Sequence, residues 1–167
     1  VLELSSFQLE STANLDADAA TLLNVSEDHL DRYHGLEDYA AAKARVFNGS
    51  GAQVLNRDDT RSSAMALPGR LIYRFGQSAP RGEQEWGIAS QEGRPWLARG
   101  DQKLMPVDEL PVSGLHNAAN ALAAGALCSA IGVADVAIIS ALRQFKGLPH
   151  RVEKVAAIDG VTYYDDS

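Results

Sequence analysis

Short apolar runs that alternate with segments of helical spacing constrain this chain most strongly. The runs have strand length, and the first leads into the acidic segment 26–31. Between the first two runs, apolar residues from Leu36 to Phe47 recur at the spacing of a helix face. This alternation predicts an α/β fold, namely a three-layer domain with a mostly parallel sheet and helices on both faces. The runs are residues 19–25, 52–56 and 71–75.

The second half of the chain predicts three further units. Residues 86–110 contain turn signals between short apolar stretches, which predicts a small antiparallel β appendage. Residues 117–131 and 135–145 have helical spacing, and Asp135 is expected to cap the second helix. Residues 152–158 and 161–164 flank Asp159-Gly160, a two-residue signal for a closing hairpin.

Composition excludes several classes of protein. The chain has 167 residues, 46% of them hydrophobic and 22% charged, which is typical of one globular domain. The net charge of −7 argues against general nucleic-acid binding. Cys128 is the single cysteine, so no intrachain disulfide forms, and no run is long enough to span a bilayer. With no signal peptide, these features predict a cytoplasmic protein that does not associate with membranes.

The opening segment places polar groups inside an apolar run. Val1, Leu2 and Leu4 are expected to form a short buried strand, with Glu3 among them and Ser5 after them. A buried carboxylate is costly without a cation, so a positive group should lie beside Glu3. The alternative, at about even odds from this motif alone, is a helix-capping serine beside a surface glutamate.

Lys43 and His29 add two candidates for a metal site. Lys43 lies on the apolar face of the helix predicted before Phe47; its stem could simply pack while the ammonium reaches solvent. If it captured carbon dioxide, the resulting carbamate would offer oxygen ligands. His29 follows a strand and has acidic neighbours, although a solvated loop histidine is the simpler interpretation. Glu3, His29 and a carbamate would suit magnesium better than zinc.

Three later motifs could bind a nucleotide. Asn117 and Asn120 share one face at the start of a predicted helix, where their amides could contact a purine, although helix capping is the commoner role. Arg151 follows a rigid Gly-Leu-Pro-His turn and is suited to a phosphate, or lies in a surface loop. Asp166 ends the last predicted strand and could accept hydrogen bonds from a ribose, or belong to a solvated turn.

Taken together, these motifs resemble the Mur ligase family in its central domain. The match runs in family order over essentially the whole chain, and the form of residues 3–9 is closest to the D-glutamate-adding members. The motifs are Glu-Leu-Ser-Ser-Phe-Gln-Leu at 3–9, Asn-Val-Ser-Glu-Asp-His-Leu-Asp at 24–31, Ala-Ala-Lys at 41–43, Gly-Leu-His-Asn-Ala-Ala-Asn at 114–120, Leu-Pro-His-Arg at 148–151 and Asp-Asp-Ser at 165–167.

The resemblance implies an activity: ATP-dependent addition of D-glutamate to UDP-N-acetylmuramoyl-L-alanine, through an acyl phosphate, in peptidoglycan precursor synthesis. It also implies roles for individual residues. Glu3, His29 and carbamylated Lys43 would hold Mg²⁺. Ser5 and His29 would contact the UDP-sugar. Asn117 and Asn120 would lie near the adenine. Arg151 would contact the ATP phosphates, and Asp166 the ribose. Lys43, His29 and Arg151 would be the catalytic residues, in a protein expected to be monomeric.

The resemblance also implies an incomplete unit. No Gly-x-x-x-x-Gly-Lys-Ser/Thr loop occurs in the sequence, whereas the family carries one upstream. Residues 1–167 are therefore expected to be a central-domain fragment that lacks the phosphate loop and both flanking domains, and to be inactive alone. Two alternatives remain: another ATP-dependent amide ligase of the superfamily, or a non-catalytic nucleotide-binding α/β module.

Overall fold

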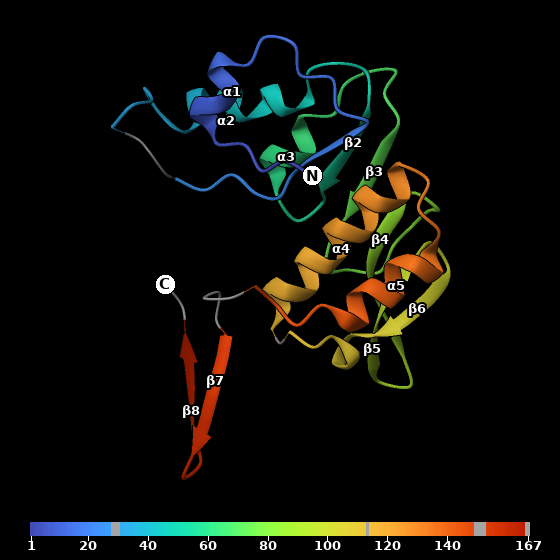
Figure 1. Ribbon diagram of the computed structural model, residues 1–167. Helices are drawn as coiled ribbons and strands as arrows, with labels where there is room; N and C mark the ends of the chain where they lie inside the picture. Colours follow the sequence, from blue (N-terminus) through green and yellow to red (C-terminus); the bar gives the residue numbers. More distant parts are fainter. Residues whose placement is uncertain (28–30, 113, 149–152, 166–167) are drawn as a thin grey trace.

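A six-stranded mixed sheet organises the molecule (Figure 1). The computed structural model describes residues 1–27, 31–112, 114–148 and 153–165. The strands lie side by side in sequence order, β1 to β6. Neighbours from β1 to β4 are parallel, and β4, β5 and β6 are antiparallel. The strands are β1 (Ala19–Leu22), β2 (Ala52–Asn56), β3 (Ile72–Phe75), β4 (Glu85–Gln91), β5 (Arg94–Arg99) and β6 (Gln102–Pro106).

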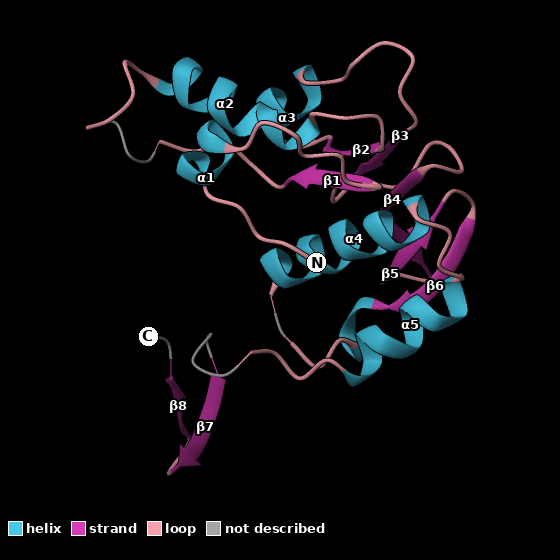
Figure 2. Ribbon diagram, turned by 45° about the horizontal axis from the view of Figure 1, so that its top comes forward, coloured by secondary structure: helices cyan, strands magenta, loops and turns pink. Residues whose placement is uncertain are grey.

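Helices cover both faces of the parallel strands, as predicted (Figure 2). Val54 and Leu55 are adjacent and both fully buried, but they belong to different hydrophobic clusters, because successive side chains of a strand point to opposite faces. Val54 faces the cluster of α4 and α5, whereas Leu55 faces that of α2. The helices are α1 (Ser6–Ser11), α2 (Leu36–Ala44), α3 (Thr60–Ala64), α4 (Leu115–Ala130) and α5 (Asp135–Gln144), with 3₁₀ turns η1 (Arg45–Phe47) and η2 (Val107–Glu109).

The antiparallel strands predicted at 86–110 are present, and they continue the main sheet. Trp86 on β4 pairs with Phe75 on β3 and is fully buried under α4. Gly125 permits this packing, since a Cβ there would lie 2.5 Å from the Trp86 ring. The small antiparallel unit of the molecule is instead the hairpin of β7 (Glu153–Ile158) and β8 (Val161–Asp165), a sheet of its own.

The predicted hairpin turn is confirmed. Asp159 and Gly160 have φ of 50° and 79°, as the two central residues of a type I′ turn require. The prediction that Asp135 caps α5 is wrong by one residue. Ala134 is the N-cap, and Asp135 lies in the first turn, where it pairs with Arg99 at 3.0 Å. Among the described helices, none is both long and apolar enough to cross a membrane.

The strand predicted at Val1–Leu4 is wrong. These residues have no regular structure, and Val1 and Leu2 are exposed. A strand gains stability only by pairing, and no described strand pairs with this segment, so its apolar pattern has no sheet to join. Glu3 is consequently exposed in coil rather than buried at a strand end. Among the described residues, no cation forms an ion pair with it.

Candidate functional site at the carboxyl edge of the sheet

The chain segments that leave β1 and β2 are bound to each other at the carboxyl edge of the sheet. The Ser62 hydroxyl, fully buried, donates to the Leu22 carbonyl at 2.8 Å and accepts from the Asn56 amide at 3.0 Å. The Asn56 side-chain amide donates to the Leu23 carbonyl at 2.7 Å. These bonds hold the start of the segment that leads toward His29.

Asp59 supplies a second link between these segments. One carboxylate oxygen accepts from the Ser62 amide at 2.7 Å and caps α3. The other accepts from the Val25 amide at 3.1 Å. Sequence reasoning missed this group, although polar residues 56–59 directly follow the buried strand β2, which is a usual signal of a site in α/β folds. His29 itself lies outside the described residues.

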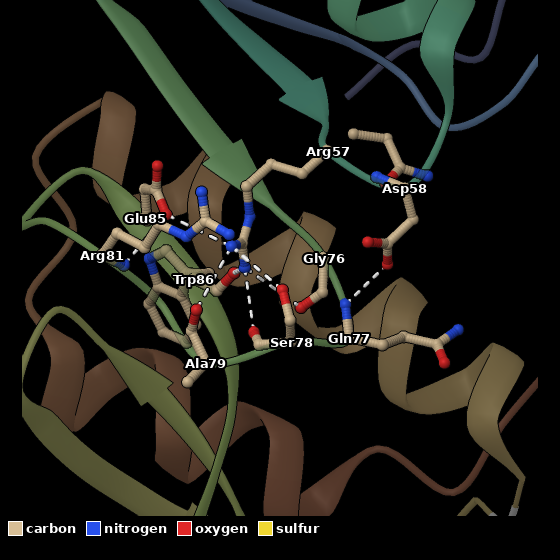
Figure 3. Close-up of polar contacts among 10 residues, drawn as sticks. Arg57, Asp58, Gly76, Gln77, Ser78, Ala79, Arg81, Glu85 and Trp86 are labelled. Carbon is tan, nitrogen blue, oxygen red and sulfur yellow. Dashed lines mark hydrogen bonds and ion pairs between the residues drawn. The ribbon is translucent and has the colours of Figure 1, made fainter.

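Arg57 organises the neighbouring strand ends (Figure 3). Its side chain is largely buried. The guanidinium pairs with Glu85 at 3.3 Å and donates to the carbonyls of Ser78, Ala79 and Trp86 at 3.0–3.2 Å. Asp58, next along the chain, accepts from the Gln77 amide at 2.7 Å. The connection between parallel β3 and β4 contains no helix, and the side chains of Arg57 and Asp58 hold its backbone at Gln77, Ser78 and Ala79.

Ser5 is the N-cap of α1, and the capping alternative predicted for it is confirmed. Its hydroxyl accepts from the Gln8 amide at 3.2 Å, and the Gln8 side chain accepts from the Ser5 amide at 2.8 Å, which makes a complete capping box. The hydroxyl still has a proton to donate to a ligand. Glu3 lies two residues earlier and is exposed.

Lys43 lies in the last turn of α2 and is half-buried, close to where the helical spacing placed it. Its ammonium sits over the ring of Tyr39, 5.0 Å from the centroid. Tyr39 precedes it by one turn, so the side chain points back toward the start of α2. Glu37 at the start of α2 pairs with Arg61 of α3 at 3.0 Å, so the start of α2, toward which Lys43 points, lies beside the helix that Asp59 caps.

Asn117 and Asn120 occupy the first two turns of α4. Figure 2 shows α4 running opposite to β1, so its first turn also lies toward the carboxyl ends of the strands. Asn117 is half-buried, and Asn120 is exposed and open to a ligand. Arg151 and Asp166 lie outside the described residues, so their predicted places stay predictions.

The described part of the chain contains no group of three His, Cys, Asp or Glu side chains that could hold a metal. The predicted magnesium set of Glu3, His29 and Lys43 is therefore not assembled from described residues. The chemistry of its donors can still be judged. The Glu3 carboxylate suits magnesium, whereas the Lys43 ammonium repels cations and fits only if it becomes a carbamate.

Comparison with known proteins gives one consistent result. A family model for the Mur ligase middle domain matches residues 1–128. The "UDP-N-acetylmuramoylalanine--D-glutamate ligase" of Methylobacillus flagellatus is 59% identical over 167 residues, which are 100% of this chain and 37% of that protein. A protein of the same name from Dechloromonas aromatica is 60% identical over 169 residues, covering 100% of this chain and 36% of that protein.

Solved structures agree on the fold. The UDP-N-acetylmuramate-alanine ligase of Thermotoga maritima superimposes with a TM-score of 0.73 at 20% identity, over 97% of this chain and 36% of that one. The chain thus spans little more than a third of the length of the relatives that it matches.

Proposed function

This chain belongs to the Mur ligase middle domain family, and we propose that it is the central domain of an ATP-dependent ligase that joins D-glutamate to UDP-N-acetylmuramoyl-L-alanine. The observation that carries the proposal is 59% identity, without a gap in coverage, to a ligase of that name. The product would be a precursor of peptidoglycan. The alternative of a ligase for another amino acid has less support, since a 2,6-diaminopimelate ligase of known structure shares 27% identity with this chain.

The proposed reaction has two steps. The L-alanine carboxylate attacks the γ-phosphorus of ATP, ADP leaves, and an acyl phosphate forms. The amine of D-glutamate then attacks the acyl carbon, loses a proton, and expels inorganic phosphate to form the amide. Two anions must approach each other in the first step, so the site must supply positive charge and exact positioning more than covalent chemistry. Arg151 is proposed to supply that charge at the phosphates.

Ser5, Asn117 and Asn120 are proposed to bind the two nucleotides. For Ser5, which would contact the UDP-sugar, the support is a helix-capping hydroxyl that keeps a proton to donate. For the asparagines, which would lie near the adenine, the support is their place in the first turns of α4 at the carboxyl edge. His29, near the UDP-sugar, and Asp166, at the ribose, are proposed from motif order alone.

Magnesium is proposed to bind Glu3, His29 and carbamylated Lys43. The fit depends on the carbamate, which would turn a half-buried cation into an oxygen donor. When bound, magnesium would neutralise charge between the phosphate and the carboxylate. We place the ligase in the cytoplasm as a monomer. We also propose that residues 1–167 alone do not turn over, because no phosphate-loop motif occurs in them.

Phosphate release by the full-length protein tests the function. The assay contains ATP, magnesium and UDP-N-acetylmuramoyl-L-alanine, with D-glutamate or other amino acids as acceptors. We expect release only with D-glutamate. Release that depends on another amino acid would be consistent with the family but would contradict D-glutamate as the acceptor. Absence of release with every acceptor would favour a non-catalytic binding module.

Lys43→Ala tests the carbamate in the same assay. We expect release to collapse and to return in part when a short carboxylic acid is added, because its carboxylate can replace the carbamate oxygens. The control is Lys103→Ala, at an exposed lysine of β6. Loss of phosphate release without rescue would argue against the carbamate but would not contradict the proposed ligase function.

A further inference from the structure

We infer that Arg45 is a positioning residue. It fixes the position of Ser5, at the start of α1, relative to that of Lys43, near the end of α2. The inference rests on the proposed function, because that proposal assigns Ser5 to the UDP-sugar and Lys43 to the metal. Nothing in the sequence motifs singles out Arg45. Its role follows from two hydrogen bonds that cross between these helices.

Arg45 binds the end of α1. Its Nε donates to the Leu9 carbonyl at 2.8 Å, and its Nη2 donates to the Thr12 carbonyl at 3.1 Å. The last carbonyls of a helix lack partners within the helix and carry partial negative charge. α1 has no basic residue in its own last turn. The Leu9 carbonyl also accepts from the Thr12 amide at 3.3 Å, so Arg45 adds from another element a second donor at this carbonyl and the positive charge that the end of α1 lacks.

The hydrogen bonds of Arg45 lie only one short helix away from Ser5. α1 has six residues, so about 9 Å of helix separates its ends, and a helix this short has no stability of its own. The position of Ser5 therefore depends on the contacts that hold both ends of α1, including those at Leu9. On the other side, Arg45 is two residues from Lys43 in a continuous turn of α2 and η1. The guanidinium of Arg45 thus connects α1, which begins at the Ser5 cap, directly to the turn that carries Lys43.

α1 also has a ring contact and an ion pair with the segment that precedes α2. The Phe7 ring stacks on Tyr33 with centroids 6.3 Å apart, and Glu10 pairs with Arg32 at 2.5 Å. Both contacts join α1 to the segment that precedes α2, not to the turn that carries Lys43. α1 also packs directly on α2 and η1, and the Arg45 guanidinium adds two directional hydrogen bonds to that packing.

Arg70 offers a matched control. It is also half-buried and also binds backbone carbonyls, including Gly49 at 2.7 Å and, through Nε, Gly51 at 2.8 Å. Those two carbonyls lie in the loop before the amino end of β2. A longer bond of Arg70 reaches the Phe47 carbonyl at the end of η1 at 3.3 Å, and none of these carbonyls belongs to α1. Arg45→Met and Arg70→Met each remove a guanidinium fork and keep an apolar stem. Arg45→Lys keeps the charge but cannot span both carbonyls as a planar fork.

The experiment compares these variants in the full-length protein by steady-state kinetics, thermal unfolding and amide hydrogen exchange. We expect both Met variants to lower the Tm. Only Arg45→Met should raise KM for the UDP-sugar, by roughly tenfold or more, as small misplacements do, and speed exchange in α1. Arg45→Lys should fall between Arg45→Met and the wild type. Equal KM and equal α1 exchange in the two Met variants would overturn the inference.

Failure of the proposed function would look different. The wild type would then show no phosphate release that depends on D-glutamate, and KM could not be measured. Faster α1 exchange in Arg45→Met than in Arg70→Met would still support the anchoring of α1, and equal exchange would overturn it.

Discussion

At the residue scale, arginine side chains donate hydrogen bonds to backbone carbonyls that in a helix or sheet would be bonded to backbone amides. Arg45, Arg57 and Arg70 each donate to backbone carbonyls at a helix end or in a connection. Partly buried carbonyls need donors, and the planar guanidinium supplies several in a fixed geometry. Substitution of these residues should therefore affect the position of a segment as well as stability.

Glu10 gives a prediction about pH. The Arg32 guanidinium, and after it the Tyr33 hydroxyl, hold the pKa of Glu10 below its ordinary value of 4.5. A carboxylate with a lowered pKa in the folded state stabilises the fold above its unfolded pKa, and this contribution is lost as the pH falls through the lowered value. Glu10→Gln should flatten the acid side of a plot of Tm against pH.

The control for Glu10 is Glu92→Gln, at an exposed carboxylate in the turn between β4 and β5. The effect of Glu10 should be modest, since both members of its pair are partly exposed and salt screens them. Identical acid limbs in wild type and Glu10→Gln would show that the pair contributes nothing to stability.

Gly125 gives a prediction about packing. A Cβ at this position would lie 2.5 Å from the ring of Trp86, which is fully buried and donates from Nε1 to Ser129 at 3.2 Å. Gly125→Ala should lower the free energy of unfolding by about 1–3 kcal/mol, despite the higher helix propensity of alanine. Urea unfolding followed by tryptophan fluorescence measures this. Ala124→Val, at the exposed neighbour, should change stability far less, and a more stable Gly125→Ala would contradict the packing.

At the element scale, short helices depend on their ends. α1 is stabilised by the Ser5–Gln8 capping box and by its contacts with α2, since six residues form no independent helix. α3 is shorter still and depends on the Asp59 cap. Both helices begin beside the proposed site, so their caps stabilise the helices and also hold the adjoining site residues in position.

Ser5 allows these two contributions to be separated. Ser5→Ala should cost about 0.5–2 kcal/mol through loss of the cap, and Ser5→Asp should restore most of it because aspartate caps equally well. If the Ser5 hydroxyl also donates to the UDP-sugar, Ser5→Asp should regain Tm without regaining substrate affinity. Thermal unfolding and titration of the UDP-sugar into the full-length protein measure the two effects. Recovery of both would confine Ser5 to capping.

At the scale of the whole molecule, one sheet separates two hydrophobic cores. Leu55 belongs to the core under α2, and Leu122 to the core under α4. Strands common to both cores should couple them into one cooperative unit. The hairpin of β7 and β8 is different, since Ile158 and Val161 are largely exposed.

Alanine substitutions test this coupling. Leu55→Ala and Leu122→Ala should each lower the free energy of unfolding by about 2–5 kcal/mol within one shared transition. Ile158→Ala should leave that transition nearly unchanged. Calorimetry of the 167-residue chain would show a single peak that moves in both core variants. Two peaks that respond separately would mean that the cores unfold independently.

Local pattern was sufficient for most of the secondary structure. The strand at 52–56, the helix from Leu36 that continues as a 3₁₀ turn to Phe47, and the type I′ turn at Asp159-Gly160 follow from apolar period and turn chemistry, which act between near neighbours. Ser5 as a cap was one of two interpretations, and the structure selects it. The position of the Lys43 ammonium over the Tyr39 ring follows from helical spacing alone, because the two residues are four positions apart.

Tertiary structure decided what depends on partners distant in the chain. The segment Val1–Leu4 has a strand pattern, yet pairing needs a neighbouring strand, and the described sheet offers it none. Strand order and the union of residues 86–106 with the parallel sheet join residues 11 or more positions apart. The bonds between Asp59 and Val25 and between Arg45 and Leu9 span 34 and 36 positions. The sequence by itself therefore determined most of the elements, the fold class and the family, but not the helix α3 or the lack of a strand at Val1–Leu4. The fold decided which side chains meet, because such contacts depend on how the elements pack and not on local periodicity.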